Sequence, residues 1–129
     1  MKSRCLLDSS VVIAALRGEP GVRERIAQVE EVFLSSIVAG ELYFGARQSH
    51  RMAENLANTE AFASGCTVLG TGLETGRVYG VLKRQLETRG RRIPENDLWI
   101  AASALEHGLS LVTRDLHFRE IEGLAINVW

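Results

Sequence analysis

Short apolar runs alternate along the chain with longer segments in which apolar residues recur every three or four positions. Apolar runs without polar alternation are typical of strands that are buried on both faces of a sheet. They predict five strands, over residues 4–8, 32–34, 66–69, 109–113 and 124–128. The periodic segments predict helices over residues 11–16, 22–29, 37–47, 50–63, 74–88 and 97–107, with a helical turn over 115–121.

The order of these elements predicts the fold class. Strands that alternate with helices form a mostly parallel sheet whose two faces are covered by helices. We therefore expect one α/β domain spanning residues 1–129. Hydroxyl side chains indicate where two helices start, since Ser9 or Ser10 can cap the helix at 11–16 and Ser35 or Ser36 the helix at 37–47.

Composition and charge leave several functions open. Hydrophobic residues make up 46% and charged residues 24% of the chain, as in ordinary globular proteins. The net charge of −1 gives no overall sign of a nucleic-acid-binding protein. Without the four acidic residues discussed below, the net charge of the remaining residues is +3. The rest of the surface is therefore slightly basic, and one basic loop contains Arg89, Arg91 and Arg92.

Other features indicate a cytoplasmic protein. No apolar run approaches the roughly 20 residues that span a bilayer, and residues 1–8 are too short and too soon acidic for a signal peptide. Cys5 and Cys66 form no CxxC pair, so we expect buried thiols in a reducing compartment. The histidines match no zinc motif, and we expect them at the surface or at helix ends.

Four acidic residues are candidates for chemistry. Asp8 ends the first strand and Asp115 follows the fourth, so both should project at the carboxyl edge of the sheet, where α/β proteins bind ligands. Asp97 opens a helix that is apolar nearly all round, and Glu41 falls within an apolar helical stripe. Each aspartate could instead be a helix cap, and Glu41 could pair with an arginine at the edge of its stripe.

Converging carboxylates have a chemical use. Like charges at close range repel unless a cation lies between them, and hard oxygen ligands favour Mg²⁺ or Mn²⁺ over zinc. Such a metal activates water and offsets the charge on a phosphoryl oxygen. The chain has neither a glycine-rich phosphate loop nor a GxSxG elbow, and no Asp-x-Asp follows the first strand, which argues against an aspartyl-phosphate phosphatase.

Four segments, in this order, resemble those of a PIN-domain ribonuclease, and within that family a VapC-type toxin. They read LLDSS at 6–10, LSSIVAGEL at 34–42, IPENDLWIAA at 93–102 and LVTRDLHF at 111–118. The final residues, 121–129, are also similar, so the resemblance covers essentially the whole chain. It implies a three-layer α/β/α sandwich with strand order 3-2-1-4-5, and a Mg²⁺- or Mn²⁺-dependent endonuclease that cuts RNA to leave a 5′-phosphate and a 3′-hydroxyl.

The resemblance also implies roles for particular residues. The positions that match the family's acidic quartet are Asp8, Glu41, Asp97 and Asp115. By this match Asp8 and Asp97 bind the metal directly, Asp115 binds it directly or through water, and Glu41 holds or orients a water molecule. Thr113 matches an auxiliary hydroxyl and Asn96 a frequent neighbour of the third acid, whereas Ser10 stands where the family often has asparagine.

Partners follow from the same resemblance. We expect an antitoxin protein whose tail covers the acidic site, and a homodimer. Apolar residues left over in the helices slightly favour the dimer, although they could equally belong to the core: Leu56, Phe62, Tyr79 and Leu82. Arg89, Arg91 and Arg92, and less strongly Arg114, are candidate contacts to RNA phosphates, although a solvated loop explains the first three equally well.

Two other interpretations compete with the ribonuclease. The runner-up is a PIN-like module that no longer cuts and serves in binding or assembly, although all four acidic residues are present. A receiver domain would need a phosphoacceptor aspartate after the third strand, which instead ends Val68-Leu69-Gly70, and a late lysine, whereas the last one is Lys83.

Overall fold

The computed structural model describes residues 3–129, and these form a sheet of five strands that are all parallel. The strands are β1 (Arg4–Leu7), β2 (Glu31–Ser35), β3 (Thr67–Leu69), β4 (Ser110–Val112) and β5 (Ile126–Asn127). Their order is β3-β2-β1-β4-β5, as the resemblance implied. The first strand of the chain therefore lies at the centre, and the direction of winding reverses beside it. In parallel sheets of this kind, that reversal is where ligands bind.

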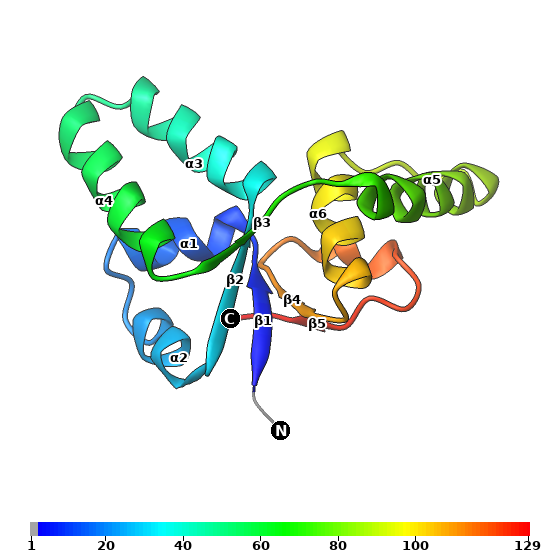
Figure 1. Ribbon diagram of the computed structural model, residues 1–129, viewed down its shortest axis with the longest axis horizontal. Helices are drawn as coiled ribbons and strands as arrows, with labels where there is room; N and C mark the ends of the chain where they lie inside the picture. The colour runs from blue at the N-terminus through cyan, green and yellow to red at the C-terminus, as the bar shows by residue number, and fades with distance from the viewer. Residues whose placement is uncertain (1–2) are drawn as a thin grey trace.

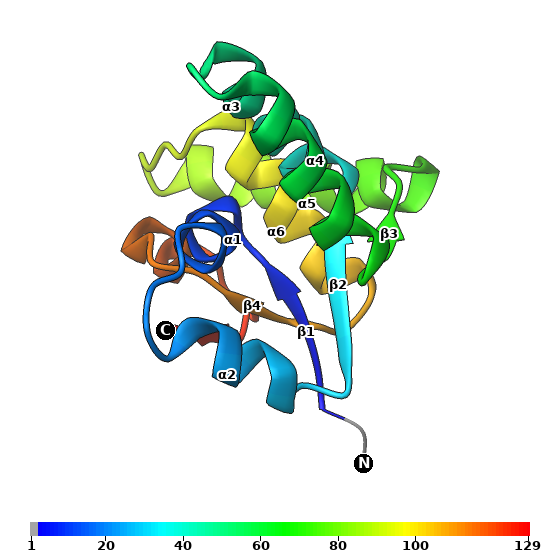
Figure 2. The same cartoon turned by 90° about the vertical axis from the view of Figure 1, so that its left-hand side faces the viewer.

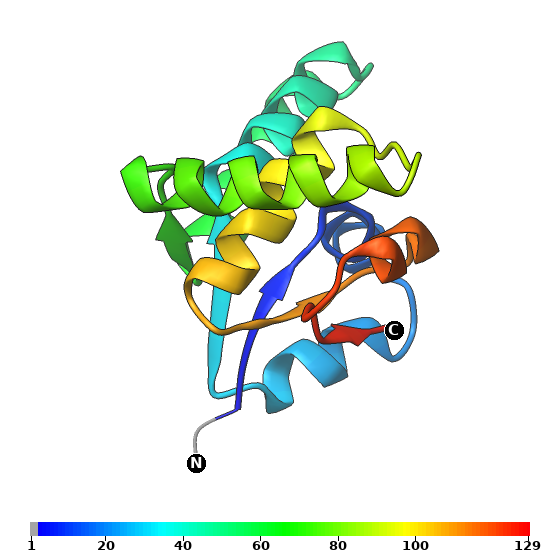
Figure 3. The same ribbon diagram turned by 90° about the vertical axis from the view of Figure 1, so that its right-hand side faces the viewer.

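Helices cover both faces of the sheet, which gives the three expected layers (Figure 1). They are α1 (Ser9–Leu16), α2 (Val22–Gln28), α3 (Ser36–Gln48), α4 (Met52–Ser64), α5 (Leu73–Thr88) and α6 (Glu95–Glu106), with a 3₁₀ helix η1 (Leu116–Glu120). One face carries α1 and α2, while α6 lies on the other with α5 outside it (Figure 3). Helices α3 and α4 pack together beyond the carboxyl end of β2 (Figure 2).

Capping side chains explain where the helices begin. Asp8, not Ser9 or Ser10, caps α1, because its carboxylate accepts a hydrogen bond of 2.9 Å from the Ser9 backbone NH. Ser35 caps α3 as predicted, through a 3.1 Å bond from the Val38 NH. Helix α6 begins at Glu95, two residues before the predicted start, so Asp97 lies within its first turn instead of at its head.

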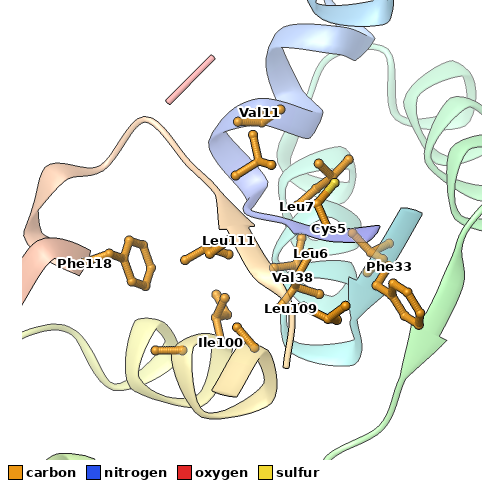
Figure 4. Close-up of a cluster of buried hydrophobic side chains, with 14 of the residues drawn as sticks. Cys5, Leu6, Leu7, Val11, Phe33, Val38, Ile100, Leu109, Leu111 and Phe118 are labelled. Carbon is orange, nitrogen blue, oxygen red and sulfur yellow. The ribbon is translucent and has the colours of Figure 1, made fainter. Parts of the chain in front are cut away.

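The core joins the sheet to both helical layers. Side chains from β1, β2 and β4 meet those of α1, α3 and α6 in the cluster of Figure 4. Leu6, Leu111 and Ile100 are completely buried, and each such side chain stabilises the fold by roughly 1.5–3 kcal/mol. Phe118 is also completely buried, and it anchors η1 against this core.

The burial of the cysteines and of the predicted dimer residues agrees only in part with the expectation, which holds for Cys5. Cys5 is buried, and burial together with the nearby Cys66 raises the pKa of its thiol to about 11. Cys66 itself is only partly buried. Leu82 belongs to the core, and Phe62 and Tyr79 pack against it, so for these three side chains the alternative of core burial holds.

No helix among residues 3–129 is both long and apolar enough to span a membrane.

Candidate active site

The four acidic residues come together at the carboxyl edge of the sheet. Asp8 follows β1 directly, and Asp115 lies three residues after β4. Glu41 lies in α3, which begins where β2 ends. Helix α6 leads back to the start of β4, so its first turn, with Asp97, lies at the same edge. The charges of these carboxylates act on one another: Asp115 raises the pKa of Asp8, and Asp8 raises that of Glu41 and of Asp97.

Asp8 is the most enclosed of the four, with 1% of its surface exposed. Burial raises the pKa of its carboxyl, although three hydrogen bonds oppose that rise. Besides the Ser9 NH, the donors are the hydroxyls of Ser10, at 3.2 Å, and Thr113, at 2.7 Å, both to Oδ2. The structure thus brings Ser10 and Thr113, two predicted auxiliary residues, into contact with the first acid.

Glu41 holds a buried oxygen without a partner. Its Oε1 atom is buried and accepts no hydrogen bond from residues 3–129. Burial raises the pKa of this carboxyl, and the charges of Asp8 and Asp97 add to the rise, while the side chains of Asn96 and Ser9 lower it. A buried carboxylate oxygen without a partner destabilises the folded protein, so a water molecule or a cation bound to this oxygen would stabilise it.

Asp97 is bound by a residue that the sequence did not single out. Its Oδ2 lies 2.6 Å from Nε2 of His117, on η1. Burial raises the pKa of the Asp97 carboxyl, and the charges of Asp8 and Asp115 raise it further, while the bond to His117 lowers it. His117 was expected at the surface or at a helix end. The position of His117 two residues after Asp115, beside the apolar Phe118, is the one signal that could have placed it here.

The donor chemistry fits a hard divalent cation. The three acids whose carboxyl pKa values are raised, Asp8, Glu41 and Asp97, offer only oxygen, the ligand that Mg²⁺ and Mn²⁺ prefer. Within residues 3–129, however, no three histidine, cysteine or acidic side chains are already arranged as a metal site. The residues therefore suit such a cation by charge and ligand type without forming a closed ligand cage.

The candidate RNA-binding arginines differ in how they are held. Arg114 pairs with both carboxylate oxygens of Glu19 and donates from Nε to the Trp129 carbonyl at 2.9 Å. Arg89 donates to the Glu120 carbonyl, and Arg91 lies 3.5 Å from the Glu120 carboxylate. Arg92 has no ion-pair or hydrogen-bond partner in the described part of the chain.

A groove extends away from Glu41 between α1, α3 and α4. Its volume is about 290 Å³. Apolar side chains such as Ile13, Leu16 and Leu42 form much of its wall, and Arg17 adds a positive charge. The groove therefore connects the acidic edge of the sheet to an apolar surface that could hold an apolar segment of another chain.

Comparison with known proteins gives a consistent result. The PIN domain model matches residues 5–124. Ribonuclease VapC2 of Haemophilus influenzae is 34% identical over 127 residues, and the tRNA(fMet)-specific endonuclease VapC of Shigella flexneri is 31% identical over the same length; each match covers 96% of both chains.

Solved structures agree with the sequence matches. The DNA-bound VapBC complex from Salmonella typhimurium contains a chain that superposes with a TM-score of 0.92 at 31% identity, covering 100% of this chain and 99% of that one. A chain of the promoter-bound VapBC2 complex from Rickettsia felis gives 0.89 at 27% identity, with 98% of each covered. This chain belongs to the PIN-domain family and, within it, to the VapC group.

Proposed function

We propose that this protein is a divalent-metal-dependent endoribonuclease, the toxin of a toxin–antitoxin pair, with its active site at Asp8, Glu41, Asp97 and Asp115. The family and the ribonuclease names of its relatives support the activity. The observation that carries the assignment of the site is the buried Oε1 of Glu41, which has no hydrogen-bond partner among residues 3–129. The charges of Asp8 and Asp97, two acids whose own carboxyl pKa values are raised, act on this carboxylate. We also propose that residues 1–129 form one PIN domain, which the match of the PIN model to residues 5–124 supports.

The side chains divide the work at this site. Asp8 and Asp97 would hold the cation, Mg²⁺ or Mn²⁺, and Asp115 would join them directly or through water. Glu41 orients the attacking water, since its Oε1 has no other partner among the described residues. Ser10 and Thr113 hold Asp8 in place by their hydrogen bonds to Oδ2. When bound, the cation lowers the pKa of a coordinated water and offsets negative charge on the phosphate.

The test uses the purified protein with cellular RNA. Cleavage should require Mg²⁺ or Mn²⁺, stop with EDTA, and leave 5′-phosphate and 3′-hydroxyl ends. The matched control is Glu41→Gln, which keeps the shape of the side chain and removes its charge, and which should not cleave. A folded wild-type protein that cleaves no RNA with either metal would instead favour the non-catalytic binding module.

We propose an antitoxin as the protein partner. Relatives of known structure are VapBC complexes, and the groove beside Glu41 suits an apolar segment that ends in a basic side chain. Such a segment would block the acidic site while its apolar part fills the groove. Co-expression with a small protein encoded next to this gene should therefore suppress RNA cleavage, and truncation of that protein's tail should restore it.

We also propose a homodimer and a cytoplasmic location, where RNA is available. The large apolar side chains that the structure exposes, including Phe44 on α3 and Leu73 and Val81 on α5, support a protein contact better than the residues predicted from sequence. Light scattering at micromolar concentration should give twice the mass of the chain. A strict monomer there would contradict the dimer and leave the nuclease assignment intact.

A further inference from the structure

His117 connects two parts of the acidic site that are far apart in sequence. Its imidazole Nε2 lies 2.6 Å from Oδ2 of Asp97, which is 20 positions earlier in the chain. It also follows Asp115 by only two residues. One side chain therefore links α6, which carries the third acid, to the segment that carries the fourth.

The position of this histidine is fixed by its neighbours. Phe118, the next residue in η1, is completely buried in the core, and its ring lies against the imidazole with centroids 4.8 Å apart. Arg89 and Arg91 hold the end of η1 through Glu120. The segment that carries the imidazole is thus held in its middle, by Phe118, and at its carboxyl end, by Glu120.

The hydrogen bond occupies one of the two carboxylate oxygens of Asp97. When Asp97 is ionised, its carboxylate only accepts hydrogen bonds, so in that state the bond requires a proton on Nε2. The bond takes Oδ2 and leaves Oδ1 available to another ligand. The Asp97 side chain is only 14% exposed, and the charges of Asp8 and Asp115 disfavour its ionised form, whereas the bond to His117 favours it.

We propose that His117 is a positioning residue of the active site, which holds Asp97 by Oδ2 so that Oδ1 is presented to the divalent cation at a set distance from Asp115. The inference rests on the proposed function, because it assumes that Asp97 binds the metal. Hydrogen-bonding partners of this kind orient metal ligands in many proteins, and their loss lowers metal affinity or activity by about 10- to 100-fold.

Three substitutions separate positioning from mere packing. In His117→Gln the amide nitrogen takes nearly the place of Nε2, whereas in His117→Asn it reaches only the place of Nδ1, and His117→Ala has no donor. We expect the glutamine variant to bind Mn²⁺ close to wild type. The asparagine and alanine variants should bind it about 10- to 100-fold more weakly.

The measurements are Mn²⁺ titration followed by electron paramagnetic resonance, RNA cleavage, and thermal melting in EDTA. His107→Asn is the matched control, since His107 lies at the opposite end of α6, 3.5 Å from Glu106. The control should bind Mn²⁺ like wild type and melt near the wild-type temperature in EDTA. The His117 variants should all stay folded there, with His117→Ala and His117→Asn melting somewhat lower because they lose the bond to Asp97.

Contrary results are distinguishable. Three results would overturn the inference while wild type still binds Mn²⁺ and cleaves RNA. The first is equal Mn²⁺ affinity in all His117 variants, and the second is Mn²⁺ affinity that falls as far in His117→Gln as in His117→Asn. The third is an equal loss of Mn²⁺ affinity in His107→Asn. A wild-type protein that neither binds Mn²⁺ nor cleaves RNA would overturn the proposed function, and this inference with it.

Discussion

The Thr113 hydroxyl donates a 2.7 Å hydrogen bond to Oδ2 of Asp8, although the two residues are 105 positions apart. The strand register explains this contact. In the parallel pair β1–β4, Leu7 lies opposite Val112, so the next residues, Asp8 and Thr113, leave the sheet side by side. Both are almost completely buried. The Thr113 hydroxyl also accepts from the Asp115 NH at 3.0 Å, and so it joins the first acid to the last.

Thr113→Val should weaken both folding and cleavage. The substitution keeps the shape of the side chain but removes its hydroxyl donor. In the wild-type protein this donor lowers the pKa of the Asp8 carboxyl. A hydrogen bond to a charged group contributes about 1.5–3 kcal/mol, so urea unfolding at neutral pH should show a loss of that order. Thr113→Ser keeps the hydroxyl and should retain most of both properties. A valine variant with wild-type stability and activity would show that this bond is unimportant.

Asp97→Asn should abolish RNA cleavage and leave the protein folded. The change removes one negative charge from a site where Asp8 and Asp115 already oppose it. Metal affinity should fall steeply because a neutral amide is a poor ligand for Mg²⁺ or Mn²⁺. Calorimetric titration with Mn²⁺ and a cleavage assay measure these effects. Full activity in the asparagine variant would remove Asp97 from the site.

Much of this arrangement could be predicted from sequence. The apolar runs located every strand, and the place of Asp8 and Asp115 just after two of them predicted that both lie at the carboxyl edge. Glu41 was recognised because it interrupts an apolar stripe, and its buried Oε1 agrees with that. In each case a local pattern, read with one rule of sheet geometry, was enough.

Contacts between distant segments could not be predicted in this way. His117 reaches Asp97 only because η1 packs beside α6, and nothing in the local pattern fixes that distance. The pairing of Arg114 with Glu19 depends likewise on the fold bringing the α1–α2 loop to the end of β4. The start of α6 was misplaced because the role of Pro94 as its N-cap was not recognised.

Arg92 and Arg114 should respond differently to alanine substitution. Arg92 is exposed, and we found no partner for it within residues 3–129, so Arg92→Ala should weaken RNA binding without changing stability. If Arg92 contacts one phosphate, the slope of log affinity against log salt should fall by about 1. Arg114→Ala should instead lower stability slightly, as is usual for the loss of a surface ion pair.

Filter binding at several salt concentrations and thermal melting measure the two arginine effects. Glu19→Gln is the control for Arg114, because it breaks the same ion pair from the other side and should lower the melting temperature similarly. If Arg114→Ala instead melts like wild type and binds RNA more weakly, the result would indicate that Arg114 contacts RNA.

The stability of the metal-free protein should decrease as pH rises from the ordinary range of carboxyl pKa values. In the folded protein the carboxyl pKa values of Asp8, Glu41 and Asp97 are raised, chiefly by burial. Between the unfolded and the folded pKa the folded state binds more protons, so the free energy of unfolding falls with rising pH across that window and levels off above it. Melting in EDTA from acid to neutral pH measures this slope.

Divalent metal should remove this loss of stability at higher pH. The metal binds the folded state alone, and it binds that state better as the carboxyls ionise. The melting temperature at neutral pH should therefore rise with Mn²⁺ concentration, and the pH slope should flatten. Asp97→Asn should raise the melting temperature in EDTA, since it removes a charge that the folded state holds at a disadvantage. The same variant should respond little to Mn²⁺. If wild type shows no metal-dependent shift and Asp97→Asn melts lower than wild type in EDTA, the acids are structural caps, and the repulsion among them is too weak to matter.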